Sequence, residues 1–125
     1  MHLYNGYKDL IVFQKSYKLA LEIFEITKGF PKEELFALTD QVRRSSRAIP
    51  ANIGAAWVKR KYPKSFVSKL LDFLEEEAET EIWFYLSRDH KYIDTETHKR
   101  LTDSYNEVAW MLQSMIHSPD KFCHQ

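Results

Sequence analysis

The chain has 125 residues, of which 44% are hydrophobic, enough to bury one core and too few for two. Eighteen basic and eighteen acidic residues leave no net charge, which excludes a whole-molecule field that would draw the protein onto nucleic acid or an anionic membrane. Its apolar stretches are far shorter than the roughly 20 residues that cross a bilayer, and the start MHLYNGYKDL lacks the apolar region of a signal peptide. We therefore expect a single domain over residues 1–125, located in the cytoplasm and not in a membrane.

The first predicted helix runs from about Leu10 to Lys28 and ends before Gly29 and Pro31. Apolar residues recur along it at steps of three and four, at Phe13, Tyr17, Ala20, Leu21 and Phe24. A second apolar line on the same segment comprises Val12, Leu19, Ile23 and Ile26. Together the two lines are wider than one bundle seam requires, which indicates a surface for a partner.

The second predicted helix spans Leu38 to about Lys61 and contains Pro50. Its inward stripe is Leu38, Val42, Ser45, Ile49, Ile53 and Ala56. A proline inside a helix removes one hydrogen bond and clashes with the preceding turn, so we expect either a kink or a break near Ala48 and Ile49. The apolar period continues through Pro50, which favours the kink.

Pro63 is expected to end that helix, and a third helix is predicted from Lys64 or Ser65 to about Arg88. Its predicted inward residues are Phe66, Leu70, Leu71, Leu74, Ala78, Ile82, Tyr85 and Leu86. A loop follows, and Asp94 or Thr95 should cap a fourth helix that ends before Ser118-Pro119. The inward residues of this last helix are Leu101, Tyr105, Val108, Leu112, Met115 and Ile116.

Four amphipathic helices with short connections predict an all-α protein, an antiparallel up-and-down four-helix bundle. Four large aromatic residues fall off the predicted inward stripes, namely Trp57, Phe73, Phe84 and Trp110. One interpretation is lateral packing within a single bundle. We favour the other, an oligomer interface, because several large aromatics in contact with water would be unusual in a monomer.

Charge is divided along the chain. Between positions 41 and 64 there are cations and no acid, at Arg43, Arg44, Arg47, Lys59, Arg60, Lys61 and Lys64. Between positions 72 and 87 there are acids and no cation, at Asp72, Glu75, Glu76, Glu77, Glu79 and Glu81. One hypothesis is that the two runs pair, within or between subunits. The other is that the basic run binds the phosphates of RNA or DNA, with Trp57 and Tyr62 as stacking groups.

No pattern of residues indicates catalysis or a cofactor. Di-iron bundles carry Glu-x-x-His pairs, but none of His90, His98, His117 and His124 has a carboxylate three positions earlier. No arginine has a histidine four to six residues after it, as in some helical ribonucleases, and the three glycines are isolated. The single cysteine, Cys123, excludes an intramolecular disulfide and a thiolate zinc site within one chain. We expect no enzyme, no metal, no cofactor and no small-molecule substrate.

Several motifs resemble one protein family. Asp9-Leu10 with Phe13, then Phe30-Pro31, then Leu38-Thr39 with Gln41, Arg43 and Arg44, and finally Ile49-Pro50-Ala51-Asn52-Ile53 follow its pattern D-L-aromatic, F-P, L-T-x-Q-x-R-R and S-I-P-A-N-I-A-E-G. Lys69-Leu70, Glu77-Ala78-Glu79-Thr80 and Trp83 are similar to its third helix. The family is that of the proteins encoded in intervening sequences of bacterial 23S rRNA genes, also called S23 ribosomal proteins. This chain departs from it at Ala48, where serine is usual, and at Ala55-Ala56, where Glu-Gly is usual.

The resemblance implies a four-helix bundle that assembles into a homo-oligomeric ring, commonly a pentamer, with no known catalytic activity. A related family, the accessory proteins of diversity-generating retroelements, forms basic rings that bind a reverse transcriptase and nucleic acid. Because this chain is neutral, we expect the assembly first and nucleic-acid binding second. The predicted function is a homo-oligomeric scaffold or adaptor, and the alternative is an RNA- or DNA-binding ring that uses the basic second helix.

Overall fold

The computed structural model describes residues 6–123, which form four long helices and three short 3-10 turns. The helices are α1 (Ile11–Thr27), α2 (Leu38–Val58), α3 (Pro63–Asp89) and α4 (Thr95–His117), and the turns are η1 (Tyr7–Asp9), η2 (Lys32–Glu34) and η3 (Pro119–Lys121). Over this part of the chain there is no β-strand. The predicted all-α fold of four helices is therefore confirmed.

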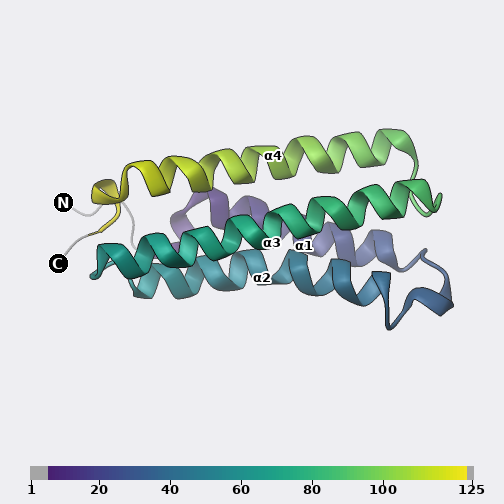
Figure 1. The fold of residues 1–125 in the computed structure, drawn as a ribbon, viewed down its shortest axis with the longest axis horizontal. Coiled ribbons are helices and arrows are strands. Elements are labelled where there is room, and N and C mark those ends of the chain that lie inside the picture. Colours follow the sequence, from purple (N-terminus) through teal and green to yellow (C-terminus); the bar gives the residue numbers. More distant parts are fainter. Residues whose placement is uncertain (1–5, 124–125) are drawn as a thin grey trace.

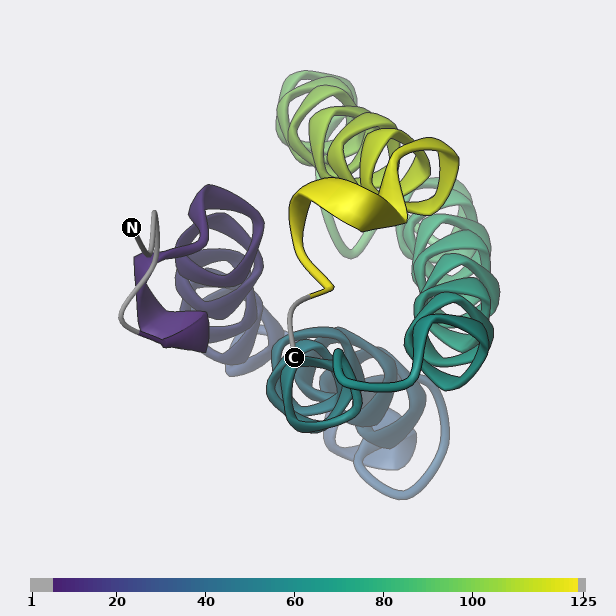
Figure 2. The ribbon, with the colours of Figure 1, turned by 90° about the vertical axis from the view of Figure 1, so that its left-hand side faces the viewer.

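Consecutive helices run in opposite directions along one long bundle (Figure 1). Helix α1 packs against α2 and α4, and α3 packs against the same two helices, while α1 and α3 share no contact. Seen end-on, the helices follow one another around the bundle axis in chain order (Figure 2). The α1–α2 side of the bundle therefore lies opposite the α3–α4 side.

Local signals explain where the helices begin and end. Helix α1 ends at Thr27, whose hydroxyl donates a 2.8 Å hydrogen bond to the Ile23 carbonyl. Asp94 caps α4, because its Oδ1 accepts a 2.7 Å hydrogen bond from the Thr97 amide. The prediction for Pro63 was wrong: α2 ends earlier, at Val58, and Pro63 is the first residue of α3. Proline suits this position because its fixed φ is helical and the first helical amide has no partner to lose.

Pro50 does not break α2. The helix continues from Leu38 to Val58, and Pro50 itself is buried. Of the two alternatives the break is wrong, because packing of Ile49 and Ile53 on both sides of the proline holds the helix together.

The core is a column of large side chains along the bundle axis. Its largest fully buried members include Tyr105, Phe66, Phe73, Ile49 and Leu70. All six predicted inward residues of α2 are buried, and so are those of α4 except the half-buried Ile116. These two inward faces are confirmed.

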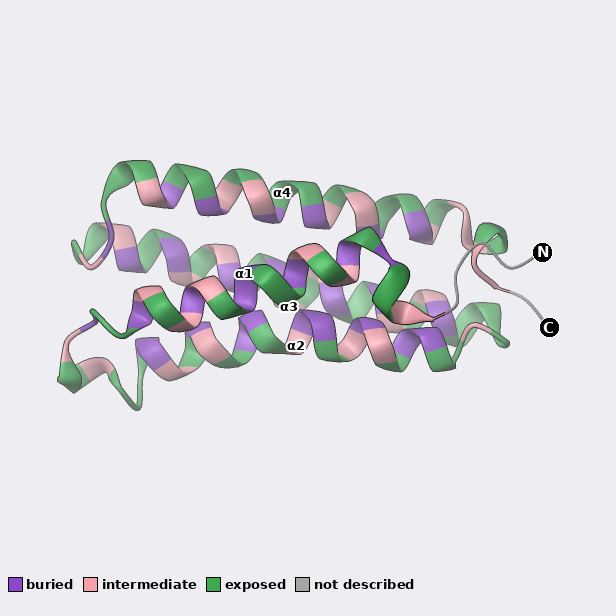
Figure 3. Cartoon of the chain, turned by 180° about the vertical axis from the view of Figure 1, so that it is seen from behind, coloured by how far each residue is buried: buried purple, intermediate pink, exposed green. Residues whose placement is uncertain are grey.

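Of the predicted inward residues of α3, Phe66 and Leu70 are confirmed and most of the others are wrong, and of the two apolar lines of α1 only the second is largely buried. On α1 the second line provides the buried Val12, Leu19 and Ile23, while Tyr17 and Leu21 are exposed. Figure 3, with α1 in front, shows exposed and half-buried turns along its outer side. On α3 the buried residues are Phe66, Leu70, Phe73, Glu77, Thr80, Phe84 and Ser87, and Leu71, Ala78, Ile82, Tyr85 and Leu86 are exposed.

No helix among residues 6–123 combines the length and the apolar character that crossing a membrane requires.

Candidate interaction surfaces

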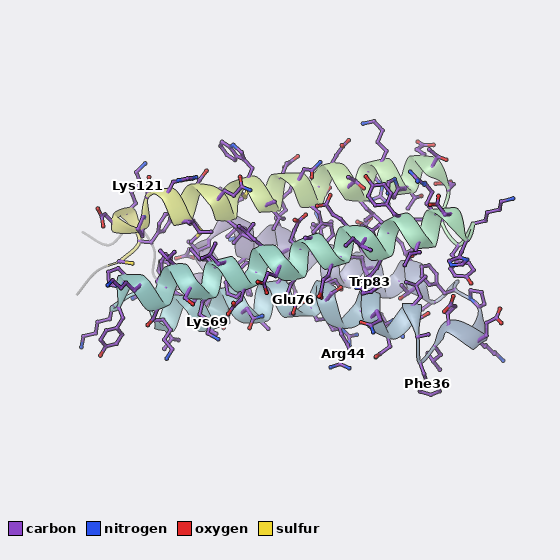
Figure 4. All side chains as sticks on the ribbon, in the orientation of Figure 1. Phe36, Arg44, Lys69, Glu76, Trp83 and Lys121 are labelled. Carbon is purple, nitrogen blue, oxygen red and sulfur yellow. The ribbon has the colours of Figure 1, made fainter. Side chains whose placement is uncertain are left out.

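The seven cations proposed to bind phosphate do not form one surface. Arg43 and Arg47 lie over the Phe24 ring of α1, at 4.5 and 5.4 Å from its centroid. Arg44 points the other way and pairs with Asp40 at 3.7 Å; Figure 4 shows its side chain directed away from the bundle. The remaining four, Lys59, Arg60, Lys61 and Lys64, lie in the α2–α3 turn and the first turn of α3.

Helices α2 and α3 pack together, as the pairing hypothesis requires, yet their opposite charges do not form ion pairs. Among residues 6–123 no ion pair within 4.0 Å joins the basic run to the acidic run. Arg44 influences Glu76 only through the charge of its guanidinium: in Figure 4 Glu76 lies on α3 beside α2, whereas Arg44 lies on the outer side of α2. Burial and the charges of Glu79 and Glu75 raise the pKa of Glu76, and Arg44 opposes that rise only in part. Most of the charge on both runs is left unpaired within the chain.

Three of the four proposed interface aromatics belong to the core. Trp57, Phe73 and Phe84 are buried inside the bundle, which corrects their assignment to an oligomer interface and supports lateral packing. The error follows from the wrong inward face of α3: Phe73 and Phe84 lie on the same face as Phe66 and Leu70. Trp110 is 68% exposed and remains a surface aromatic.

An open apolar groove lies between α1 and α2, with a volume of about 670 Å³. From η1 and α1 it is lined by Tyr7, Phe13, Tyr17, Ala20, Leu21 and Phe24. From α2 it is lined by Arg47, Pro50, Ala51, Gly54, Ala55 and Val58. We call this the α1–α2 groove. Its lining contains one charged residue, the cation Arg47, and no acid.

A second apolar surface runs along the outer side of α3. Leu71, Ala78, Ile82 and Tyr85 are exposed and recur at steps of seven, four and three residues, so they lie on one face of the helix. We call this the α3 stripe. Glu75 falls at the missing position of the same repeat and is also exposed. The Tyr85 ring lies 4.8 Å from the His98 ring of α4, so the stripe leans toward α4.

The two surfaces lie on opposite sides of the bundle, because the groove belongs to α1 and α2 and the stripe to the outer side of α3 nearest α4. Figure 2 makes the separation of α1 and α3 visible. Sequence reasoning indicated a partner surface on the first helix but placed the residues of the α3 stripe in the core. The signal was present, since both α1 and α3 carry more apolar positions than one buried face can hold.

A third exposed apolar site is the tip of the α1–α2 connection. Phe36 is 92% exposed and points away from the end of the bundle in Figure 4. The Tyr92 hydroxyl donates a 2.8 Å hydrogen bond to Glu34 Oε2 and ties this connection to the α3–α4 loop. Phe36 is thus held out in water by an anchored loop.

Buried polar groups form a layer near the middle of α3. Thr80 Oγ1 donates a 2.9 Å hydrogen bond to Ser45 Oγ across the α2–α3 contact. Glu77 is buried, and its Oε1 and the Tyr105 hydroxyl have no hydrogen-bond partner among the described residues. Burial first, and then the hydrogen bond and charge of Glu81, raise the pKa of Glu77 to about 9. The carboxyl is therefore neutral at pH 7, and burial raises the pKa of Tyr105 as well.

This polar layer is closed inside the core rather than placed in an open pocket. Across residues 6–123, no group of three or more histidine, cysteine, aspartate or glutamate side chains is placed to hold a metal ion; His124 lies outside those residues. The solvent-exposed features described above are apolar surfaces with charged residues at their edges. Such surfaces bind other protein surfaces.

Comparison with known proteins identifies the family to which this chain is similar. Residues 8–114 match the family described as 23S rRNA-intervening sequence protein. The fold is similar to the crystal structure of a protein of unknown function from the S23 ribosomal protein family of Bacteroides thetaiotaomicron, with a TM-score of 0.76 and 30% sequence identity. That similarity covers 86% of this chain and 96% of the other. No curated protein matches the sequence.

Proposed function

Since the chain belongs to the family of 23S rRNA-intervening sequence proteins, we propose that it is a non-enzymatic scaffold or adaptor that assembles with copies of itself. The proposed assembly is a ring in the cytoplasm, and five is the number of copies that the family resemblance implies. No cofactor and no small-molecule substrate enter the proposal.

The observation that carries the proposal is the amount of apolar surface left in contact with water. Leu21 and Ile82 are 57% and 54% exposed, and each belongs to a larger surface, the α1–α2 groove or the α3 stripe. Scattered exposed apolar residues are ordinary, but gathered ones are typical of binding surfaces. Two such surfaces on opposite sides give each copy two neighbours, as a ring requires.

Sedimentation velocity of the purified protein tests this proposal. At micromolar concentration we expect a species several times heavier than the 14.9 kDa chain, with the monomer appearing only on dilution. A single monomeric species over the whole concentration range would contradict the proposal.

A second candidate function, binding of RNA or DNA, is favoured by one feature. Lys59, Arg60, Lys61 and Lys64 lie together at the α2–α3 turn, without an acid between them in the sequence. In a ring whose axis is parallel to the bundles, these turns would gather on one face and add their charges. Arg43, Arg44 and Arg47 take no part in this candidate, because they are engaged elsewhere.

Co-purifying nucleic acid and the salt dependence of binding test the second candidate. We expect the affinity for single-stranded RNA to fall steeply as salt rises, and the double substitution Lys59→Glu with Lys61→Glu to abolish binding. Lys99→Glu on α4, away from the turn, is the control and should bind as the unaltered protein does. Absence of binding at low salt would exclude this function and leave the scaffold proposal intact.

A further inference from the structure

We propose that the α1–α2 groove of one copy receives the α3 stripe of the next copy, head to tail. This inference rests on the proposed self-assembly and adds which surfaces meet. Its basis is the shape, the position and the charge of the two surfaces.

The shapes correspond. On α2 the groove is lined by small residues in two adjacent turns, Pro50, Ala51, Gly54 and Ala55, which allow close approach of another helix. Its α2 lining extends over 12 residues, from Arg47 to Val58, or about 16 Å at the rise of an α-helix. From Leu71 to Ile82 the stripe covers the same number of residues and the same length. Leu71 is the large side chain that would enter the groove between α1 and α2, and Ala78 and Ile82 would lie at its end, near Arg47 and Phe24.

The positions require a head-to-tail contact. If the grooves of two copies met each other, both stripes would remain exposed to water. If two stripes met each other, both grooves would remain exposed. When a groove takes a stripe, both surfaces of every copy in a closed ring are covered. Because the two surfaces lie on opposite sides of the bundle, one copy binds two neighbours without a clash between them.

The charges complement each other. Three cations, Lys28, Arg43 and Arg47, lie over the Phe24 ring at one end of the groove, at 4.5 to 5.4 Å from its centroid. Glu75 lies within the α3 stripe, and neither Glu75 nor Arg47 forms an ion pair with another described residue. A groove without acids therefore faces a stripe that carries Glu75, with one cation, Arg88, over the Tyr85 ring at its far end, 5.0 Å from the ring centroid.

The levels of these residues along the bundle point to one specific pair. The Thr80–Ser45 hydrogen bond places residue 80 of α3 level with residue 45 of α2. Glu75 lies about 7 Å along the axis from Thr80, and Arg47 about 3 Å from Ser45 in the same direction, because α2 and α3 are antiparallel. If the neighbouring copy is related by a rotation about an axis parallel to the bundle, each of its residues lies at the same height along that axis as in the first copy. Glu75 of that neighbour then comes within reach of the long Arg47 side chain.

Two substitutions that each block one surface test the head-to-tail contact. Leu21→Glu places a carboxylate in the groove, and Ile82→Glu places one in the stripe; both positions are more than half exposed, so the fold should be kept. Each variant alone should be monomeric. An equimolar mixture should form a dimer of twice the monomer mass, because the intact stripe of the first variant fits the intact groove of the second, while the two altered surfaces repel each other.

The proposed ion pair is tested by exchanging its charges. Arg47→Glu and Glu75→Arg should each weaken assembly by about tenfold, and the double variant should recover most of that loss. Gln41→Glu, at an exposed position outside both surfaces, is the matched control and should assemble normally. Far-UV circular dichroism establishes that every variant is folded.

The possible outcomes separate this inference from the proposed function. A monomeric unaltered protein overturns both. If the unaltered protein assembles and both single variants assemble equally well, only the pairing of groove with stripe is overturned. If Leu21→Glu disrupts assembly but Ile82→Glu still assembles by itself, the groove binds a surface other than the stripe, and if both variants are monomeric but their mixture yields no dimer, the groove and the stripe do not bind each other; either result overturns the head-to-tail pairing.

Discussion

The two faces of α3 differ in burial, and the polarity of their residues would not predict which face is buried. The inward face includes Glu77, Thr80 and Ser87, yet it is buried. The outward face presents Leu71, Ile82 and Tyr85, yet it is in contact with water. A helix with a polar residue inside and apolar residues outside is unusual for a monomer in water. The difference supports the proposal that the outward face contacts another copy, whereas the inward face is held by the aromatics Phe66, Phe73 and Phe84.

The largest expected effect compares neighbouring positions on these two faces. Phe73→Ala should lower the free energy of unfolding by about 3–5 kcal/mol, because Phe73 is fully buried and its removal leaves a cavity. Leu71→Ala, two residues earlier and half exposed, is the matched control and should cost under about 1 kcal/mol in the monomer. Urea unfolding at low protein concentration measures both. Equal losses would show that the two faces do not differ in burial.

The next effect concerns the buried carboxyl and depends on pH. The folded-state pKa of Glu77, about 9, lies above that of an unfolded chain, so the folded state keeps a proton that the unfolded state releases. Stability should therefore fall as the pH rises from the ordinary carboxyl range toward 9. Glu77→Gln removes this loss and should stabilise the protein by about 1 to 3 kcal/mol at pH 8, with little change at pH 4.

Urea unfolding at the two pH values checks this expectation. Glu79→Gln, an exposed carboxylate on the same helix, is the control and should leave the pH dependence unchanged. A Glu77→Gln variant with the same pH dependence as the unaltered protein would show that this carboxyl ionises freely in the folded state.

A smaller effect tests the hydroxyl pair that joins α2 to α3. Thr80→Val keeps the side-chain shape but removes the hydroxyl, whose oxygen lies 2.9 Å from Ser45 Oγ and 2.7 Å from the Glu76 carbonyl oxygen. The expected cost is about 1 kcal/mol. In a Ser45→Ala background the same substitution should cost less, because the shared hydrogen bond is already absent. Identical costs in both backgrounds would mean that the pair adds nothing to the α2–α3 contact.

The smallest effect belongs to the outward face. Ile82→Gln should change the stability of the monomer by less than about 0.5 kcal/mol, since more than half of its side chain is already in water. At high concentration, however, the unaltered protein should gain stability from assembly and the variant should not. Thermal unfolding over a range of concentrations checks this. A large loss in dilute solution would place Ile82 in the core.

The number of helices and the capping signals were accessible from the sequence. The three- and four-residue apolar steps identified all four helices, and Asp94 predicted the start of α4 correctly. Pro63 was misplaced because a proline fits both after one helix and at the first position of the next, and only the tight turn from Lys59 to Tyr62 decides between them. The start of α2 at Leu38 and the fourth-helix core were also predicted.

The interaction surfaces were much less accessible. On α1 and α3, apolar residues occupy two faces of the helix. The sequence pattern alone does not determine which of the two faces packs into the core. The rotation of each helix is set by packing of its neighbours, as when Phe84 meets Tyr105 at 5.4 Å between ring centroids. The wide apolar surface of α1 predicted a partner, which stays a prediction, and the exposed line is the one containing Tyr17 and Leu21.

The lean of the α3 stripe toward α4 has a geometric consequence. In the proposed assembly, each copy turns the next by 180° minus the angle between the outward directions of its two surfaces. Surfaces facing directly away from each other would stack copies in a straight filament, whereas an inclined pair closes, with a turn of about 72° for five copies. The Tyr85–His98 contact holds the stripe toward α4 and so helps to fix how far the two directions depart from a straight line. In the proposed ring, the placement of these two aromatic side chains therefore contributes to the curvature, and a substitution that rotates the stripe by a few degrees would change how many copies complete the circle.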